Sequence, residues 1–311
     1  MNLRKVAIVG CGFVGAACAF TLMQHGLYSE MVLIDSNRAR AEGEAMDISH
    51  GLLYAKPMNI YAGDYDDAAD ASLIIITAGA NQKPGETRLD LVKKNADILL
   101  SIIGKINARK YEGMLLIVAN PVDILTHVAQ KHAHLPEKHV FGSGTVLDTA
   151  RLKYLLGEHL SIDSRSVHAF IIGEHGDSEI PVWSSASVSG VPLRTFCEMR
   201  AYYDHENSMR EIGESVKQSA YRIIERKGAT YYGIAMAVQR ICEAVVRNEH
   251  SILPVSVALH GEFGIEDTTL SIPSVLGSDG VENIVPISLS REELTKLQYS
   301  AEMLKGIYSE L

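Results

Sequence analysis

Residues 5–15 read KVAIVGCGFVG, a short β-branched strand that leads directly into three glycines with GxGxxG spacing. In a strand–turn–helix unit, Gly10 permits the tight turn, Gly12 lets the backbone approach a pyrophosphate, and Gly15 lets the helix lie against the strand. The helix N-terminus then offers free amide donors and the positive end of its dipole to phosphate groups. Alone, this pattern is weak, because a glycine-rich turn can also bind nothing.

An acidic residue at the expected distance strengthens this interpretation. Asp35 follows the apolar run MVLI, 20 residues after Gly15, where a carboxylate can accept hydrogen bonds from both ribose hydroxyls of an adenosine. A 2′-phosphate on that ribose would be repelled, so the sequence predicts NAD rather than NADP as cofactor. The same glycines argue against a signal peptide in the apolar stretch 6–24.

Short β-branched runs alternate with helical patterns through the first half of the chain. Strands are expected at 5–9, 31–35, 58–62, 73–77 and 114–120, with helices ending near residues 25, 53 and 106 and another after 120. Strands that are apolar on both faces and alternate with helices predict a parallel sheet covered by helices. Right-handed crossovers favour a doubly wound arrangement.

After about residue 145 the pattern changes. Helices are expected at 147–159, 205–226 and 229–247, then strands of an antiparallel meander at 251–261, 268–277 and 280–289. A capping box, Ser290 and Glu293, begins an amphipathic last helix. The predicted fold class is α/β: a doubly wound parallel Rossmann sheet in an NAD-binding domain, 1–144, followed by a mixed α+β substrate domain, 145–311.

Composition excludes several classes of function. The formal net charge of −9 and the lack of a basic stripe argue against nucleic acid as a partner. No stretch reaches the ~18 apolar residues of a membrane span, so no membrane association is expected. The four cysteines have neither CxxC spacing nor the density of a secreted scaffold, which favours a cytoplasmic location. The histidines of KHAHLPEKH flank a proline turn, and no metal site is expected there.

A histidine between two glycines, in IIGEHGDS, is the candidate for proton transfer. Imidazole is suited to move protons near neutral pH, although His175 taken alone fits a solvated loop histidine better. Asn120 lies at the end of a predicted strand, the side where ligands bind to such a sheet. Asp148 and Arg151 share one face of a helix. An aspartate beside an imidazole favours its charged form, and a guanidinium can hold a carboxylate by two parallel hydrogen bonds.

Several motifs, in order along essentially the whole chain, resemble one family. GCGFVG with Asp35, NQKPGETR, VANPVDI, LDTAR and IIGEHGDSEIPVW are together similar to the NAD-dependent 2-hydroxyacid family of L-lactate and malate dehydrogenases. Because the motifs are separate and stand at family spacing, the resemblance is specific.

The resemblance implies roles for the site residues. His175 is the proton donor and acceptor, Asp148 orients it, and Arg88 arrives on a mobile loop to polarise the substrate carbonyl. Arg151 grips the substrate carboxylate, and Asn120 bonds the reacting oxygen. The implied substrate-binding residues are Gln82, Arg88, Asn120, Asp123, Asp148, Arg151, Thr230 and Ile234. The implied cofactor-binding residues are Gly10, Gly12, Phe13, Val14, Gly15, Asp35, Arg40, Tyr65, Thr77, Gly79, Ala80, Ser101, Val118, Asn120 and Ser143.

One position separates the two branches of the family. Malate enzymes typically have an arginine where this sequence has Gln82, and an arginine facing the methyl group of pyruvate would be an unpaired desolvated charge. Thr230 and Ile234 also match the lactate branch. We therefore predict reversible hydride transfer between NADH and pyruvate, giving L-lactate and NAD⁺ in fermentative glycolysis. A malate dehydrogenase and a non-catalytic NAD-sensing protein are the alternatives.

The same resemblance implies a second site. Bacterial members that bind fructose 1,6-bisphosphate at a subunit interface use a basic residue two beyond the substrate arginine and a histidine seven before the catalytic one, where Lys153 and His168 stand. Lysine lacks the bidentate fork of arginine, which bears on affinity. We expect activation by this sugar bisphosphate in a homotetramer that lacks a long N-terminal arm, since only four residues precede the first predicted strand.

Overall fold

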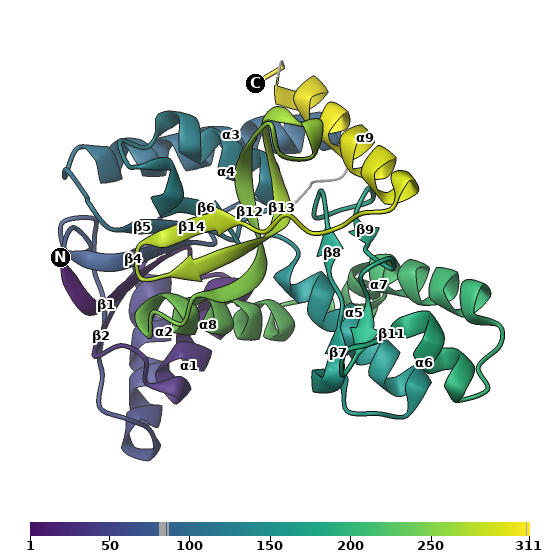
Figure 1. Ribbon diagram of the computed structural model, residues 1–311. Coiled ribbons are helices and arrows are strands. Elements are labelled where there is room, and N and C mark those ends of the chain that lie inside the picture. The colour runs from purple at the N-terminus through teal and green to yellow at the C-terminus, as the bar shows by residue number, and fades with distance from the viewer. Residues whose placement is uncertain (81–84, 86, 309) are drawn as a thin grey trace.

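The computed structural model describes residues 1–80, 85, 87–308 and 310–311, and of Arg88 only the backbone. Gln82 and Pro84 therefore lie outside the described residues. Figure 1 shows two regions: a large sheet with helices on both faces, and a smaller group of helices and short strands beside it.

The first half of the chain forms the predicted alternation of strands and helices. Its strands are β1 (Asn2–Val9), β2 (Glu30–Ile34), β3 (Asn59–Ala62), β4 (Ala71–Ile76), β5 (Met114–Ile117) and β6 (Val140–Gly142). Its α-helices are α1 (Phe13–His25), α2 (Arg38–His50), α3 (Arg88–Asn107) and α4 (Val122–His132), with 3₁₀ turns at Gly51–Tyr54 and Glu137–His139.

These six strands are parallel and lie in the order β3-β2-β1-β4-β5-β6. Strand β4, ASLIII, is buried along its whole length because helices cover both faces of the sheet. One core cluster joins the sheet to α1 and α2, and another joins it to α3 and α4. The predicted doubly wound parallel sheet is confirmed, and the carboxyl ends of its strands form one edge where ligands bind in such folds.

The second half of the chain contributes the remaining elements. Its helices are α5 (Val146–Leu160), α6 (Leu193–Met199), α7 (His205–Lys227), α8 (Tyr232–Val246) and α9 (Arg291–Tyr308), with 3₁₀ turns at Ser164–Ser166 and Glu262–Gly264. Its strands are β7 (Val167–His168), β8 (Ile171–Ile172), β9 (Ile180–Pro181), β10 (Ser187–Val188), β11 (Val191–Pro192), β12 (Ser251–His260), β13 (Glu266–Gly277) and β14 (Gly280–Ile284).

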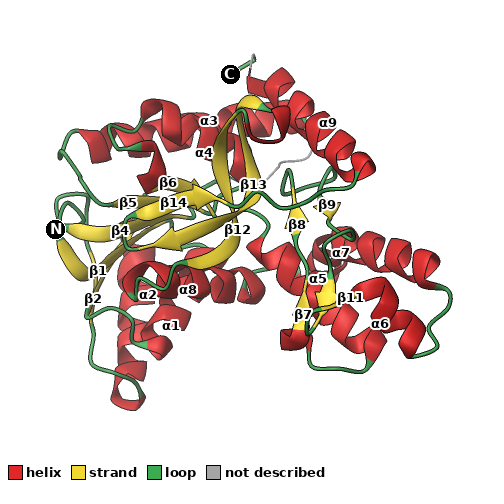
Figure 2. Cartoon of the chain, in the orientation of Figure 1, coloured by secondary structure: helices red, strands yellow, loops and turns green. Residues whose placement is uncertain are grey.

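The predicted antiparallel meander is confirmed as β12-β13-β14, but it extends the first sheet. Ser256 of β12 pairs with Gly142 of β6, so that within the described chain the main sheet has nine strands. Figure 2 shows these strands continuing from the parallel ones. The main sheet therefore contains strands from both sides of residue 144. The division of the chain into two domains at that residue stays a prediction.

The smaller region packs around a core of its own. Buried side chains of α5, α6 and α7 meet those of β7, β8 and β10. The terminal helix α9 begins as predicted: the Ser290 N–H donates to Glu293 Oε2 at 2.7 Å, and the Glu293 N–H donates to Ser290 Oγ at 3.2 Å. Among the described residues, no helix combines the length and apolarity needed to cross a membrane.

Candidate active site

The three glycines of GCGFVG occupy three different environments at the end of β1. Gly10 has φ +102°, and a Cβ there would lie 2.5 Å from the backbone nitrogen of Ala78. A Cβ on Gly15 would lie 1.8 Å from the carbonyl oxygen of Gly10. At Gly12, by contrast, no described atom lies within 4 Å of that position. Gly10 and Gly15 therefore make the turn possible, while Gly12 leaves open space at the N-terminus of α1, as a pyrophosphate requires.

Asp35 follows β2 and is held by the neighbouring backbone. Its Oδ2 accepts a hydrogen bond from the Cys11 N–H at 2.7 Å, and its Oδ1 accepts one from the Asn37 N–H at 2.8 Å. A carboxylate has about four acceptor positions. The remaining lone pairs of Asp35 are thus available to the hydroxyls of a ribose.

A cavity of about 650 Å³ lies along this edge of the sheet. Eight of the expected cofactor residues line it: Gly10, Gly12, Asp35, Arg40, Tyr65, Thr77, Gly79 and Ser101. Thr77 also fixes the glycine turn, because its Oγ1 donates to the Gly10 carbonyl at 2.7 Å. The open position at Gly12, the dipole of α1 and the acceptors of Asp35 fit a dinucleotide.

The other expected cofactor residues lie outside the lining of this cavity. They are Phe13, Val14, Gly15, Ala80, Val118, Asn120 and Ser143. Phe13 is exposed and stacks on Tyr231 with ring centroids 5.5 Å apart, which brings the start of α1 beside the segment before α8. Val118 and Ser143 are buried at the ends of β5 and β6.

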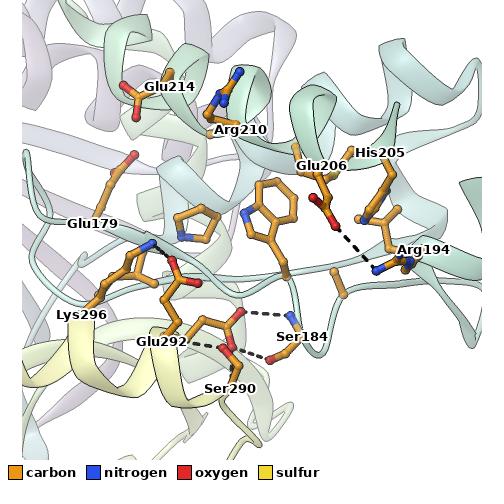
Figure 3. Close-up of a pocket in the computed structure, with 18 of the residues that line it drawn as sticks. Glu179, Ser184, Arg194, His205, Glu206, Arg210, Glu214, Ser290, Glu292 and Lys296 are labelled. Carbon is orange, nitrogen blue, oxygen red and sulfur yellow. Dashed lines mark hydrogen bonds and ion pairs between the residues drawn. The ribbon is translucent and has the colours of Figure 1, made fainter. Parts of the chain in front are cut away.

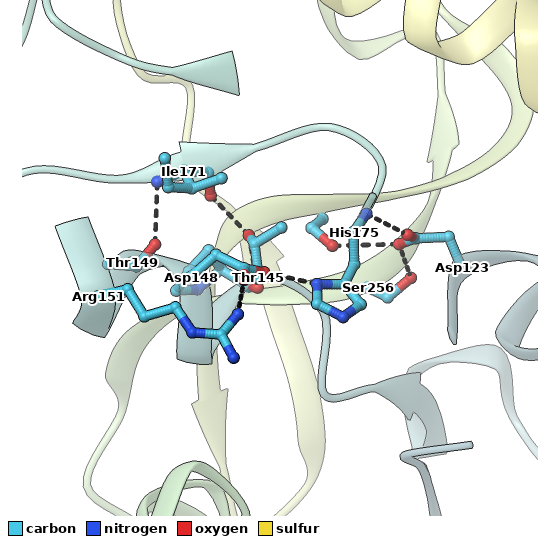
Figure 4. A network of polar contacts seen from close by, with 10 residues as sticks. Asp123, Thr145, Asp148, Thr149, Arg151, Ile171, His175 and Ser256 are labelled. Atoms are coloured by element: carbon cyan, nitrogen blue, oxygen red, sulfur yellow. Dashed lines mark hydrogen bonds and ion pairs between the residues drawn. The ribbon is translucent and has the colours of Figure 1, made fainter. Parts of the chain in front are cut away.

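The catalytic candidates meet at the start of α5 (Figure 4). His175 Nδ1 and Asp148 Oδ2 are 2.5 Å apart, and the Arg151 Nη1 donates to Asp148 Oδ1 at 2.8 Å. Asp148 is buried, and the His175 side chain is 25% exposed, so its ring remains accessible. Because an ionised Asp148 only accepts hydrogen bonds, Nδ1 carries a proton and Nε2 is left for a ligand.

This arrangement sets the charge of the histidine. Burial by itself lowers the pKa of His175, but the Asp148 carboxylate outweighs it and, with Asp123 and Glu179, raises that pKa to about 9. Conversely, burial raises the pKa of Asp148, but His175 and Arg151 outweigh it and leave that pKa below its usual value. The pair therefore stands as carboxylate and imidazolium at neutral pH.

The loop that carries His175 is anchored on α5. The Thr145 Oγ1 donates to the Ile171 carbonyl at 2.5 Å, and the Ile171 N–H donates to Thr149 Oγ1 at 2.9 Å (Figure 4). These contacts hold β8 against the helix that bears Asp148. Sequence reasoning missed both threonines, because nothing local distinguishes them from solvated helix residues.

Asp123 lies at the start of α4, and its expected contact with the substrate stays a prediction. The residue is 1% exposed, and its carboxylate accepts hydrogen bonds from the His175 N–H at 2.7 Å, Ser256 Oγ at 2.6 Å and Ser271 Oγ at 3.1 Å. Its position under the histidine backbone depends on β12 and β13, which lie more than a hundred residues later in the chain. The carboxylate therefore holds the backbone of His175 in place.

Only some of the remaining substrate candidates lie among the described residues. Thr230 and Ile234 are half-buried at the start of α8, which touches α5 where the Cβ position of Gly233 comes 2.9 Å from Leu147 Cδ1. Gln82 and the side chain of Arg88 lie outside the described residues. Arg88 is the first residue of α3.

Asn95 lies between two loops of the site, and Lys153 and His168 lie on α5 and β7. Asn95, which sequence reasoning missed inside the apolar pattern of α3, donates through Nδ2 to the Asn120 carbonyl at 2.9 Å and accepts from the Ala80 N–H at 2.7 Å. It therefore ties together the loops after β4 and β5. Lys153 is half-buried on α5, and His168 is exposed on β7.

These features suit a redox reaction of a small carboxylic acid. A dinucleotide site and a paired imidazolium lie at the same edge of the sheet. Among the described residues, Asp148 accepts a hydrogen bond from Arg151 Nη1, and the other guanidinium nitrogens are left for a carboxylate. Asp148, His175 and Glu179 each place one ligand-type atom within 4.8 Å of the others. Since both oxygens of Asp148 are already engaged, we assign this cluster to proton chemistry.

The chain belongs to the lactate/malate dehydrogenase family. Residues 4–142 match the family model of the NAD binding domain, and residues 145–310 match that of the α/β C-terminal domain. It is thus an NAD-dependent oxidoreductase.

Individual relatives lie within one branch. The L-lactate dehydrogenase of Acetivibrio thermocellus is 50% identical over 99% of this chain and 98% of its own, and that of Priestia megaterium is 51% identical over 97% and 95%. A lactate dehydrogenase from a Medee basin deep-sea metagenome library superimposes with a TM-score of 0.97 at 45% identity, covering 99% of both chains. The minor L-lactate dehydrogenase from Enterococcus mundtii in its ligand-bound form gives 0.95 at 43%, covering 99% of this chain and 98% of the other.

Proposed function

We propose that this protein is an L-lactate dehydrogenase that reduces pyruvate with NADH and, in reverse, oxidises L-lactate with NAD⁺. The observation that carries the proposal is the 2.5 Å pairing of His175 with Asp148, whose second oxygen holds Arg151 at 2.8 Å. An acid that can give up a proton and a cation that can hold a carboxylate are thus fixed by one buried side chain. The names of the relatives and the neutral Gln82 support pyruvate over oxaloacetate.

When bound, the reduced nicotinamide supplies the hydride. His175 holds the proton at Nε2 for the developing alkoxide, and Asp148 stabilises the imidazolium until the proton leaves. Arg151 binds the substrate carboxylate with the nitrogens that Asp148 leaves free. The proton affinity fits this task, since a His175 pKa of about 9 keeps the free enzyme charged for pyruvate reduction at neutral pH.

The other roles are proposed on the same basis. Arg88 polarises the carbonyl, Asn120 bonds the reacting oxygen, and Thr230 and Ile234 form the far wall of the pocket. The cofactor-binding residues expected from the sequence contact NAD. Support comes from the cavity of about 650 Å³ that eight of them line.

Product analysis tests this function. Purified protein incubated with NADH and pyruvate should form L-lactate and NAD⁺ in equal amounts. Formation of D-lactate, or no oxidation of NADH by pyruvate while oxaloacetate is reduced, would contradict it.

We also propose activation by fructose 1,6-bisphosphate through Lys153 and His168. Support comes from their basic character, since a bisphosphate is bound by paired cations, and from the packing of β7 against α5 in one core. Pyruvate saturation curves should move to lower concentration in the presence of the sugar bisphosphate. Identical curves would refute the regulatory role.

A cytoplasmic homotetramer is proposed as the working form. Apolar side chains remain exposed on neighbouring elements, namely Phe13 and Phe20 of α1, Met46 of α2, Leu53 and Tyr54 after it, and Tyr232 and Met236 of α8. Monomers rarely expose so much apolar surface. Sedimentation at working concentration should give a tetramer, and a monomer would contradict the proposal.

A further inference from the structure

Glu179 is a buried carboxyl group to which the sequence reading gave no role. It stands at the end of the loop that joins β8 to β9, and the same loop carries His175. Its side chain is 5% exposed, and its Oε1 is buried without a hydrogen-bond partner among the described residues. One of its oxygens lies within 4.8 Å of ligand-type atoms of both His175 and Asp148.

A second buried glutamate shows what a structural carboxylate looks like in the same region. Glu293 lines the same cavity of about 720 Å³ as Glu179. Figure 3 shows Glu179 in this cavity, with Ser184 and Ser290 nearby. It accepts hydrogen bonds from the Ser184 N–H at 3.0 Å, the Ser184 Oγ at 2.5 Å and the Ser290 N–H at 2.7 Å. Burial raises the pKa of Glu293, but these donors outweigh it and lower that pKa.

The described residues place no such donor on Glu179 Oε1. Burial and the neighbouring Asp148 charge raise the pKa of Glu179 to about 8, against the opposing effects of His175, Lys217 and Arg151. A buried polar group without a partner costs stability, so its presence needs a reason other than packing. Of the cations that lower the pKa of Glu179, His175 has the largest effect.

We propose that Glu179 is a positioning residue that, together with Asp148, favours the imidazolium form of His175 and so strengthens the hold of the catalytic group on its proton. This inference rests on the proposed role of His175. A carboxylate oxygen within 4.8 Å of a ring nitrogen in a poorly solvated site stabilises the positive charge. As the pH rises, ionised Glu179 opposes loss of the histidine proton, so the two groups titrate as a pair.

In the part of the chain that the structure describes, the charged groups that face this pair come from several elements. Asp148 and Arg151 lie on α5, Lys217 lies on α7, and Asp123 lies on α4 under the histidine backbone. Asp148 and Asp123 act with Glu179 on the imidazolium, whereas the two cations lower the pKa of Glu179. Replacing Glu179 alone therefore leaves the Asp148 contact intact and isolates the second carboxyl group.

The Glu179→Gln variant tests the proposal, because it keeps the shape and removes the charge. The pH at which kcat/KM for pyruvate falls on the alkaline side should move down by about one unit. The plateau at lower pH should stay within about threefold, since Asp148 still orients the ring. Glu214→Gln is the matched control: it makes the same charge change on an exposed residue of the same cavity and should leave the profile unmoved. A lower plateau without a shift would show a merely structural role and overturn the proposal.

A second measurement is independent of turnover. Diethylpyrocarbonate acylates unprotonated imidazole, and the rate at His175 can be followed by peptide mass spectrometry across pH. Its midpoint should be lower in Glu179→Gln than in the wild type, and equal midpoints would refute the inference. If the wild type fails to reduce pyruvate, the proposed function fails while this titration still decides the role of Glu179. Loss of the fold in both Glu179→Gln and Glu179→Met would also overturn the proposal, because the carboxyl group would then be required for folding.

Discussion

Asp148→Asn is the substitution that probes the chemistry most deeply. Asp148 Oδ2 lies 2.5 Å from His175 Nδ1, and the raised pKa of His175, from 6.5 to about 9, is owed first to this carboxylate acting against burial. That change corresponds to about 3 kcal/mol in favour of the imidazolium. Without the charge, burial should outweigh the remaining Asp123 and Glu179 carboxylates and leave the pKa of His175 at or below its ordinary value.

The lower pKa of His175 should reduce kcat/KM for pyruvate at alkaline pH. The reaction needs protonated His175, so kcat/KM is constant below the pKa of the histidine and falls above it. The alkaline fall should therefore move from about pH 9 in the wild type to about pH 6.5 or lower in the variant. At pH 8 the protonated fraction would drop from about 90% to about 3%, which by itself lowers kcat/KM about thirtyfold.

Initial rates of NADH oxidation at saturating NADH, with pyruvate varied between about pH 5.5 and 10, would measure this shift. Glu158→Gln is a suitable control, because it removes a carboxylate from an exposed position of the same helix. The control profile should overlay that of the wild type. An Asp148→Asn profile with its alkaline fall still near pH 9 would refute the assignment of Asp148 as the group that sets the proton affinity of His175.

Four further substitutions test the cofactor site and the specificity loop. Gly12→Ala should weaken NADH binding at least tenfold, about 1.4 kcal/mol, but should not lower the melting temperature of the free protein, because the added Cβ meets only open space. Gly15→Ala should lower the melting temperature, because its Cβ would lie 1.8 Å from the Gly10 carbonyl. Calorimetry measures the melting temperature, and fluorescence titration measures NADH binding. Asp35→Asn should reduce the preference for NADH over NADPH by about tenfold or more, since it removes the repulsion of a 2′-phosphate; an unchanged ratio of the two kcat/KM values would contradict this role. Gln82→Arg should raise the oxaloacetate-to-pyruvate ratio of kcat/KM by about a hundredfold by supplying a partner for the second carboxylate, and no rise would show that position 82 does not face it.

Local signals predicted much of the fold. The glycines of GCGFVG, the acid after β2 and the capping box of Ser290 and Glu293 depend on residues close together in the chain, and the structure forms all of these local features. The short pieces α6, β10 and β11 were missed, because two-residue strands and a seven-residue helix carry almost no periodicity.

Long-range contacts account for what the sequence could not supply. The joining of β12 to β6 depends on one pairing, Ser256 with Gly142, that no local pattern announces. The surroundings of Asp123 also depend on distant residues, because serines of β12 and β13 donate hydrogen bonds to its carboxylate. The burial of Glu179 also follows from long-range packing around the β8–β9 loop. Among the described residues its Oε1 meets no hydrogen-bond donor, and only the fold distinguishes it from an exposed loop acid.

The ratio of kcat/KM for pyruvate to that for oxaloacetate, measured with NADH at neutral pH, tests the central claim most directly. Both substrates offer a 2-oxo carboxylate to Arg151 and His175, and they differ only in the group that faces the specificity loop. With glutamine at position 82, the ratio should be well above one, because a second carboxylate would be buried without a cation. A ratio below one would contradict the assignment of this chain as an L-lactate dehydrogenase.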